Sequence, residues 1–191
     1  MFVGMWRYFT VFIFSVLVYA NTIQNGFVLD DKMAITENPF TLNGAGGVID
    51  HFTHSYWYAL NQKNEGTYRP ISPLSFALEF ELFGLNAAGY HALNVLFFGL
   101  LALVLFQLML RLNWLHPNLS LLIILLFAAH PIHTEVVANI KSRDEIYCFL
   151  FFVLALLSFD KFLANNKWWW LICSLLLSLI SVLSKETGIM I

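Results

Sequence analysis

The sequence predicts an all-α membrane protein, a polytopic bundle of about five transmembrane helices with one long outer loop. Of its 191 residues, 59% are hydrophobic and 12% are charged, about half the charged share of an average soluble domain. The hydrophobic residues form runs close to the ~20 residues that a helix needs to cross a bilayer, without the roughly ten-residue alternation of barrel strands. The formal net charge of −2 gives no reason to expect nucleic acid as a partner. We therefore expect a single membrane domain over residues 1–191.

The first apolar run, at about residues 5–20, is the first expected span. Its end, Val18-Tyr19-Ala20, also fits a signal-peptide cleavage site, because compact residues stand one and three places before the cut. We favour an uncleaved span, since multi-spanning proteins seldom need a separate signal. In either case residues 21–88 form an exported outer loop, in which segment 71–85 is expected to be a helix lying on the membrane interface.

Four further spans are expected at about residues 89–110, 118–140, 146–163 and 168–183. The second of these is purely apolar only to Ala129, and twelve apolar residues cannot cross a bilayer. The polar residues from His130 to Glu135 must therefore lie at membrane depth or mark a re-entrant segment. The sequence ends on apolar residues up to Ile191, so we expect it to be the front portion of a longer protein.

The alternation of crossings predicts that nearly all acids share one face of the membrane. The loops after the first, third and fifth spans meet on that face, and they hold every acid except Asp160. The short loops and the N-terminus place Arg7, Arg111, Lys161 and Lys167 on the other face, against Lys141, Arg143 and Lys185 on the acid-rich face. Because basic residues favour the cytoplasmic side, we expect the acid-rich face to be lumenal in the endoplasmic reticulum or periplasmic at a bacterial inner membrane.

Asp30 and Asp31 are adjacent carboxylates directly after the first span, and they are the expected catalytic residues. One interpretation is structural, because an Asp before Lys32 can cap a helix N-terminus. The functional interpretation is a general base at the membrane surface, which takes a proton from a hydroxyl while the second acid orients it or a metal. The sequence leaves both interpretations open.

A second polar motif, from His130 to Glu135, interrupts the third span. On a helix His130 and His133 would share a face, whereas Glu135 would point elsewhere. The order differs from the H-E-x-x-H of zinc proteases, so a zinc site at the two histidines is a minor alternative, and a kinked helix end at the headgroups is another. We expect these three residues to line a cavity.

Positive side chains on the acid-rich face run against the orientation rule and invite a functional reason. We expect Lys141, Arg143, Lys185 and Arg69 to bind the phosphate or pyrophosphate of a lipid carrier, because a guanidinium can hold two phosphate oxygens at once. The alternative is that they are ordinary loop charges.

Six motifs in this order resemble the membrane half of the TMTC family, the transmembrane and tetratricopeptide-repeat O-mannosyltransferases, and its bacterial relatives. They are Phe27-x-x-Asp30-Asp31, Tyr68-Arg69-Pro70, His91-x-x-Asn94, His130-Pro-Ile-His133-Thr-Glu135, Arg143, and Ser184-Lys185-Glu186-x-Gly188-Ile189. The family's later spans and its repeats are absent from this sequence, so we expect the acceptor-binding part to lie outside it.

This resemblance implies a GT-C type glycosyltransferase. Such an enzyme takes a sugar, here expected to be mannose, from a polyprenyl- or dolichyl-phosphate carrier and transfers it to a Ser or Thr hydroxyl of a protein acceptor. By the same resemblance Asp30 is the base and Asp31 its partner, while His91 and Glu186 join the residues that line the pocket. A divalent metal is left open as a cofactor.

Two other classes of function compete with this interpretation. A transporter or an ion or proton channel would place polar residues at mid-membrane on several spans, reachable from both faces. The polar residues here crowd one face instead, which favours the enzyme. A scaffold or lipid-binding module without catalysis is the third possibility.

Overall fold

The computed structural model describes residues 4–63 and 66–190. Within these ranges every regular element is a helix, with ten α-helices connected by shorter helical turns and loops. This confirms the predicted all-α class. Glu65, one of the acids of the outer loop, and Ile191 lie outside the described residues.

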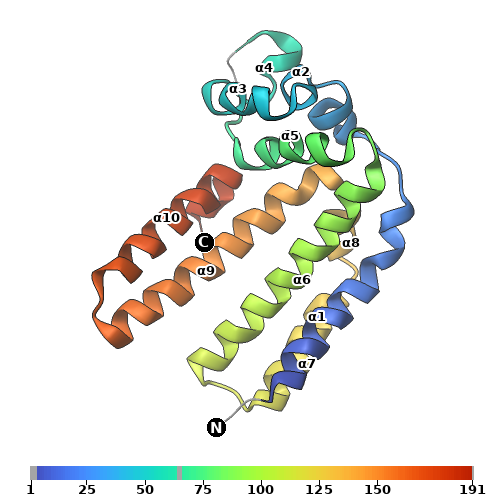
Figure 1. The fold of residues 1–191 in the computed structure, drawn as a ribbon. Helices are drawn as coiled ribbons and strands as arrows, with labels where there is room; N and C mark the ends of the chain where they lie inside the picture. Colours follow the sequence, from blue (N-terminus) through green and yellow to red (C-terminus); the bar gives the residue numbers. More distant parts are fainter. Residues whose placement is uncertain (1–3, 64–65, 191) are drawn as a thin grey trace.

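Five helices run alongside one another as an elongated bundle (Figure 1). They are α1 (Met5–Tyr19), α6 (Ala87–Leu112), α7 (Pro117–Ala128), α9 (Arg143–Asn165) and α10 (Trp168–Ser184). The central helix α6 contacts α1, α7 and α9, and α9 also contacts α10. Apolar side chains such as Phe98, Leu101 and Ile146 form the core between these helices. For helices in a bilayer, close van der Waals packing of such side chains and polar contacts between the helices hold the bundle together.

Three helical stretches are long and apolar enough to cross a membrane: Met5–Gln24, Ala87–Leu112 and Ile140–Asn165. The helices α7 and α10 are apolar but shorter, with 12 and 17 residues. At about 1.5 Å per residue they extend only ~18 and ~26 Å, against a hydrocarbon core of about 30 Å. Three candidate spans are therefore found, and the five-span arrangement stays a prediction.

The segment expected to span at 118–140 is a broken helix. Helix α7 ends at Ala128, a turn follows, and a separate helix α8 (His133–Ala138) continues along the bundle. The Asn94 amide on α6 donates to the carbonyls of Val137 (3.4 Å) and Asn139 (3.1 Å) at the end of α8. A break of this kind is tolerated away from water where neighbouring side chains satisfy the freed backbone groups.

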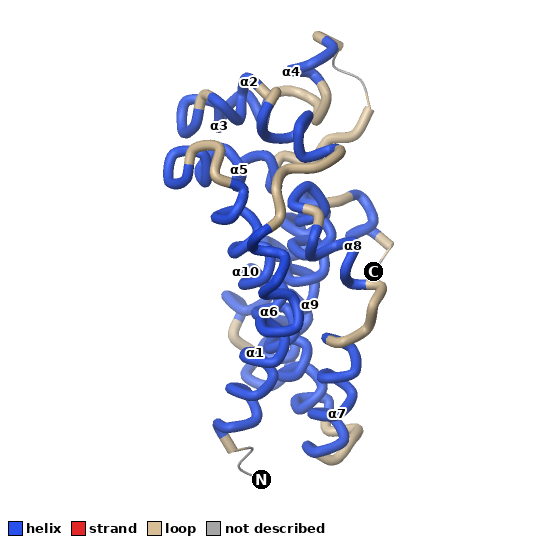
Figure 2. Tube along the Cα trace, turned by 90° about the vertical axis from the view of Figure 1, so that its right-hand side faces the viewer, coloured by secondary structure: helices blue, strands red, loops and turns tan. Residues whose placement is uncertain are grey.

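A layer of short helices covers one end of the bundle (Figures 1 and 2). We call it the cap; it consists of α2 (Pro39–Leu42), α3 (Val48–Thr53), α4 (Tyr58–Asn61) and α5 (Ile71–Phe83). Helix α5 lies across the ends of the long helices, and it confirms the helix expected at 71–85. It stops at Gly84, whose φ of +55° is a conformation that glycine adopts without steric cost.

Arg143, at the start of α9, fastens the cap to the bundle. Its side chain is 0% exposed and forms an ion pair with Glu79 of α5. Its Nε donates to Asn94 Oδ1 (2.5 Å), and its Nη2 donates to the carbonyl of Tyr90 (2.9 Å). The guanidinium carbon also lies 4.8 Å from the centre of the Phe76 ring. One buried cation thus joins α5, α6 and α9.

We predict that Arg143→Met strongly destabilises the protein. The substitution leaves the carboxylate of Glu79 buried without its cation, and breaking a buried pair in this way typically costs about 3–5 kcal/mol. Thermal unfolding in detergent without added phospholipid measures the loss.

The matched control is Arg111→Met, which removes the arginine of an ion pair at the other end of the bundle. The side chains of Arg111 and Asp160 are 42% and 38% exposed, and exposed pairs contribute about 0–1 kcal/mol. Adding Glu79→Leu to Arg143→Met should restore part of the lost stability, because it removes the buried carboxylate that has no cation. Equal destabilisation by the two single substitutions would contradict the role of Arg143.

His51 is a buried titratable group inside the cap. Its Nε2 lies 3.4 Å from the hydroxyl of Thr41, which in turn donates to the carbonyl of Ala34 (2.9 Å). Burial lowers the pKa of His51 from 6.5 to about 4, partly opposed by the charge of Asp50. The folded cap therefore favours the neutral imidazole.

This shift predicts that acid weakens the cap. Stability from neutral His51 is fully present above its unfolded pKa of 6.5 and is lost as pH falls toward 4, about 2 kcal/mol by pH 5. The measurement is the unfolding midpoint at pH 7.5 and pH 5 in the wild type and in His51→Gln. The variant should be less sensitive to pH, and an unchanged pH dependence would contradict the prediction.

Candidate functional site

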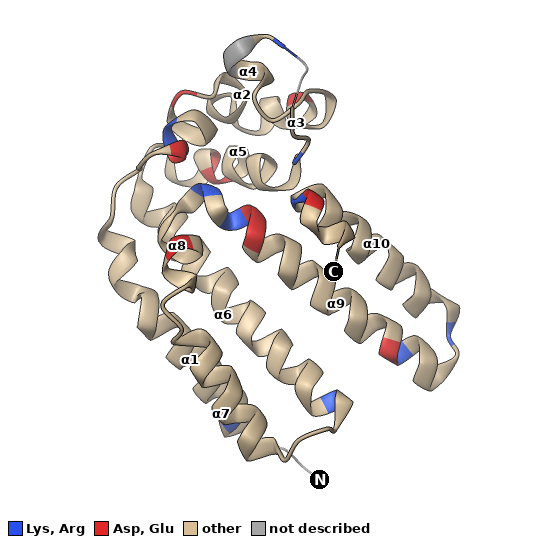
Figure 3. Cartoon of the chain, turned by 180° about the vertical axis from the view of Figure 1, so that it is seen from behind, with Lys and Arg blue, Asp and Glu red and all other residues tan. Residues whose placement is uncertain are grey.

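The charged residues gather at the two ends of the bundle (Figure 3). The acid-rich end carries the cap, the start of α9 and the end of α10, while the connections after α6 and α9 lie at the opposite end. Successive long helices therefore alternate in direction, as the sequence predicts. The candidate site lies at the acid-rich end.

Asp31 is fully buried and ties two distant parts of the chain together. Its Oδ2 accepts from the backbone N–H of Val28 (3.0 Å), and its Oδ1 accepts from the backbone N–H of Lys141 (2.8 Å). Its side chain does not cap the short helix Lys32–Thr36 that follows, so the capping interpretation fails for Asp31. Burial raises the pKa of Asp31, and the two N–H donors partly offset the rise.

Asp30 differs from its neighbour in being available. It is half-buried, and within the described chain its carboxylate takes part in no hydrogen bond or ion pair with another residue. The preceding residue, Leu29, has a φ of +46°, which a side-chain-bearing residue rarely adopts. Asp31 therefore fixes the loop, and Asp30 is the carboxylate of the pair that remains free of other side chains in the described chain.

Three of the four expected phosphate-binding cations form ion pairs at this end of the bundle, and we call this set of pairs the ionic network. Arg69 bridges Asp144 (Nη1 to Oδ2, 2.8 Å) and Glu186 (Nε to Oε2, 2.7 Å). The ammonium of Lys141 lies 3.5 Å from the same Asp144 oxygen, and Lys185 pairs with Glu145, the next residue of α9. The three cations are between 16% and 18% exposed, so they remain reachable from outside.

The carboxylates of this network differ in exposure. Asp144 is 2% exposed, whereas Glu145 and Glu186 are 43% and 46% exposed. Slight burial tends to raise the pKa of Glu186, but a backbone N–H and the Arg69 guanidinium hold it below its ordinary value. Asp144 is thus a fixed anchor, while the two glutamates lie at the surface.

Arg143, the fourth expected cation, lies apart from the network in the buried cluster described above. Its donors are engaged by Glu79, Ser75, Asn94 and the Tyr90 carbonyl. This arrangement gives Arg143 a structural role, and we leave it out of the phosphate-binding set.

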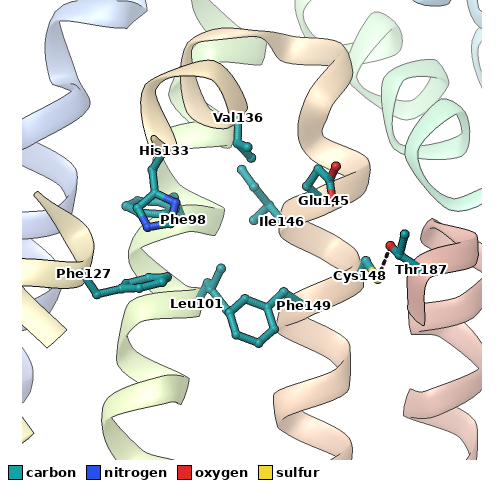
Figure 4. Close-up of a pocket in the computed structure, with 10 residues that line it drawn as sticks. All are labelled: Phe98, Leu101, Phe127, His133, Val136, Glu145, Ile146, Cys148, Phe149 and Thr187. Carbon is teal, nitrogen blue, oxygen red and sulfur yellow. Dashed lines mark hydrogen bonds between the residues drawn. The ribbon is translucent and has the colours of Figure 1, made fainter. Parts of the chain in front are cut away.

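A cavity of about 300 Å³ opens beside the ionic network (Figure 4). It is lined by Phe98, Leu101, Phe127, His133, Val136, Glu145, Ile146, Cys148, Phe149 and Thr187. Its walls are mostly apolar, and Glu145, the partner of Lys185, stands on its wall. The cavity is therefore an apolar space that lies next to the charged end of the bundle.

The expected pocket-lining residues do not all reach this cavity. His133 does, with its ring centre 4.3 Å from that of Phe127. His130 is exposed, and its Nδ1 accepts from the backbone N–H of Ile132 (3.2 Å). Glu135 is also exposed. His91 is buried beneath the acidic-pair loop, with Nε2 3.4 Å from the carbonyl of Gly26.

Across the described residues no group of three or more His, Cys, Asp or Glu side chains is arranged to hold a metal ion. The ring centres of His130 and His133 lie 6.3 Å apart. The ring of His133 is packed between aromatic side chains, and His130 closes a turn. The pair is thus engaged in local packing.

Tyr56 is a residue of the site that sequence reasoning missed. It is 8% exposed, and its hydroxyl is buried without a hydrogen-bond partner. Burial raises the pKa of Tyr56, and the charges of Asp144, Asp30 and Asp31 raise it further while Arg69 opposes them. The hydroxyl is therefore close to both the acidic pair and the ionic network. In the sequence Tyr56 belongs to the aromatic run Tyr56-Trp57-Tyr58, which by itself indicates only contact with lipid headgroups. Nothing in the sequence therefore indicated that Tyr56 lies near the acidic pair.

Tyr56→Phe should leave the free energy of unfolding unchanged or raise it by about 1 kcal/mol, because it removes a buried hydroxyl that has no partner. Chemical or thermal unfolding of the two proteins provides the test. The comparison variant is Tyr90→Phe, which deletes a hydroxyl that donates to the carbonyl of Gly84 (2.9 Å). If Tyr56→Phe destabilises as much as Tyr90→Phe, the hydroxyl of Tyr56 has a structural partner after all.

Comparison with characterised proteins gives a consistent set of relatives. The chain is 35% identical over 187 residues to human "Protein O-mannosyl-transferase TMTC1", and the match covers 92% of this chain. It is 30% identical over 207 residues to mouse "Protein O-mannosyl-transferase TMTC4", with 96% of the chain covered. A Drosophila melanogaster O-mannosyl-transferase, Tmtc1, is 32% identical over 176 residues.

The match covers only a fraction of these relatives. The chain spans 21% of the length of human TMTC1 and 28% of mouse TMTC4. No protein-family model matches the chain, and no solved structure matches it either.

Proposed function

We propose that this chain, which is homologous over more than nine-tenths of its length to TMTC protein O-mannosyl-transferases, carries a site for transfer of mannose from a lipid-phosphate carrier. The acceptor is a Ser or Thr hydroxyl of a protein. The site faces the lumen of the endoplasmic reticulum or the bacterial periplasm, in a multi-pass membrane protein of the GT-C type. The observation that carries the proposal is that an available carboxylate, Asp30, three partly exposed cations and an apolar cavity all lie at the capped end of the bundle.

The donor fits this end of the bundle by its chemistry. A polyprenyl or dolichyl chain is apolar and its phosphate is anionic, and the cavity of about 300 Å³ is apolar with the Lys185–Glu145 pair at its wall. The polyprenyl or dolichyl chain of the donor would lie against Phe98, Phe127 and Phe149, which leaves its phosphate at the ionic network. Apolar burial supplies affinity, and the cations fix the reactive end.

Phosphate binding would exchange partners within the ionic network. The exposed carboxylates of Glu186 and Glu145 can turn outward and release Arg69 and Lys185 to phosphate oxygens. Buried Asp144 would stay and keep Arg69 and Lys141 in place. Charge-assisted hydrogen bonds of this kind are about twice as strong as neutral ones.

The reaction proceeds as an inverting displacement. Asp30 takes the proton of the acceptor hydroxyl, whose oxygen forms a new bond to the anomeric carbon of mannose. The bond between that carbon and the phosphate oxygen breaks, and the lipid phosphate leaves with the electron pair. Arg69, Lys141 and Lys185 stabilise the charge that develops on it. Asp31, fixed by two backbone N–H groups, positions the base.

Asp30→Asn should lower mannose transfer from a lipid-phosphate donor to a Ser- or Thr-containing peptide by about 10²-fold or more, because an amide cannot accept the proton. The assay uses membranes that contain the protein, with protein amount checked in parallel. Asp160→Asn, at the opposite end of the bundle, is the matched control and should retain transfer. Unchanged transfer in Asp30→Asn would exclude this base, and a wild type without transfer would contradict the proposed function.

A further inference from the structure

A second cavity lies between α6 and α9 near the end of the bundle opposite the cap. Its volume is about 250 Å³, and it is lined by Gln107, Arg111, Leu154, Leu157, Ser158 and Lys161. Two cations, an amide and a hydroxyl thus line one cavity with two leucines. Neither the proposed transfer reaction nor the packing of the core uses this combination.

The hydrogen bonds around the cavity leave several donors unused. Arg111 donates from Nε (2.8 Å) and Nη2 (2.5 Å) to a single oxygen of Asp160, so Nη1 remains available. Gln107 accepts from the hydroxyl of Tyr8 (2.5 Å) with its carbonyl oxygen, which turns its NH₂ group away from that bond. The ammonium of Lys161 lies 4.3 Å from the centre of the Trp170 ring and forms no ion pair in the described chain.

The charge around this cavity favours an anion. Asp160 is the one acid between Glu145 and Glu186 in the sequence, and it is paired with Arg111. Lys161 and Lys167 lie at the same end of the bundle, each over a tryptophan ring. One carboxylate against these three cations and Arg7 leaves this end of the bundle positive. The opposite end, by contrast, carries nearly all the acids (Figure 3).

Tryptophans identify the depth of the cavity relative to a membrane. Trp168, Trp169 and Trp114 are 67%, 47% and 81% exposed and lie in or next to the connections at this end. Tryptophan is enriched at the headgroup level, where its apolar ring and its N–H both find partners. The cavity between α6 and α9 thus opens where phospholipid headgroups would lie.

We propose that this cavity binds the phosphate headgroup of an anionic phospholipid. The phosphodiester oxygens accept from Lys161, from Nη1 of Arg111 and from the amide of Gln107, while Leu154 and Leu157 contact the start of the acyl chains. Basic pockets between membrane helices are suited to such headgroups. The inference rests on the membrane placement in the proposed function, but not on the transfer reaction.

The experiment compares two lysines that differ in one respect. Lys161 and Lys167 lie at the same end, and each ammonium is stacked on a tryptophan, at 4.3 Å and 5.2 Å from the ring centre; only Lys161 lines the cavity. The detergent-solubilised protein is titrated with phosphatidylglycerol, phosphatidylcholine or inorganic phosphate, and the shift in unfolding midpoint gives the apparent affinity.

We expect phosphatidylglycerol to raise the midpoint and phosphatidylcholine to have little effect. Lys161→Gln should weaken the apparent affinity for phosphatidylglycerol about tenfold, as loss of one charge-assisted hydrogen bond predicts. Lys161→Arg should retain binding, and Lys167→Gln should stay within about twofold of the wild type, since a surface charge contributes little.

Three results would overturn the proposal. Equal weakening by Lys161→Gln and Lys167→Gln would indicate diffuse attraction to charge, and equal shifts with both phospholipids would exclude headgroup selectivity. An equal shift with inorganic phosphate would show a free-anion site. Asp30→Asn should retain the phosphatidylglycerol shift, so failure of the transfer mechanism and failure of this site give different results.

Discussion

The buried guanidinium of Arg143 is the interaction on which the arrangement of the cap and the candidate site depends. A cation removed from water must be paired and fully hydrogen-bonded, because its desolvation costs several kcal/mol. Glu79 of α5, Asn94 and the Tyr90 carbonyl of α6 meet that requirement. Since these partners come from separate helices, the cap can occupy only a narrow set of positions over the bundle.

That constraint determines the geometry of the ionic network. Asp144 and Glu145 follow Arg143 directly on the first turn of α9, so fixing Arg143 also fixes the two carboxylates that hold Arg69, Lys141 and Lys185. Asn94 extends the same constraint to the broken helix, because its amide binds the carbonyls at the end of α8. Asp31 then attaches the first outer loop to Lys141. The acidic pair, the cations and the apolar cavity are thus held at one end by a connected set of polar contacts.

The two ends of the bundle have opposite electrostatic character. The cap end combines acids with cations that are already paired, which suits the exchange of partners that a reaction requires. The other end has one acid and several cations among tryptophans, which suits stable contact with anionic headgroups.

Much of the candidate site could be predicted from the sequence because charges are rare in it. A charged residue in an apolar chain has few possible locations, so the alternation of crossings alone predicts that Asp30, Arg69 and Lys185 share one face. The different roles of the residues within the acidic pair, and within the set of cations, could not be predicted. The sequence does not show whether Asp30 or Asp31 is buried, or whether Arg143 lies in the ionic network with Lys141 or in a separate buried cluster. Both outcomes depend on which residues of other helices are in contact with these side chains.

The sequence by itself determined the helical class, three of the five expected long apolar helices and the end of the bundle at which the acids gather. These follow from composition and from the length of apolar runs, which are local properties of the chain. Only the tertiary structure decided that the segment after Ala129 breaks, that Tyr56 approaches the acidic pair and that Asp31 joins a loop 110 residues away. Such contacts depend on which helices become neighbours, and many alternative packings of similar apolar helices satisfy the same sequence pattern.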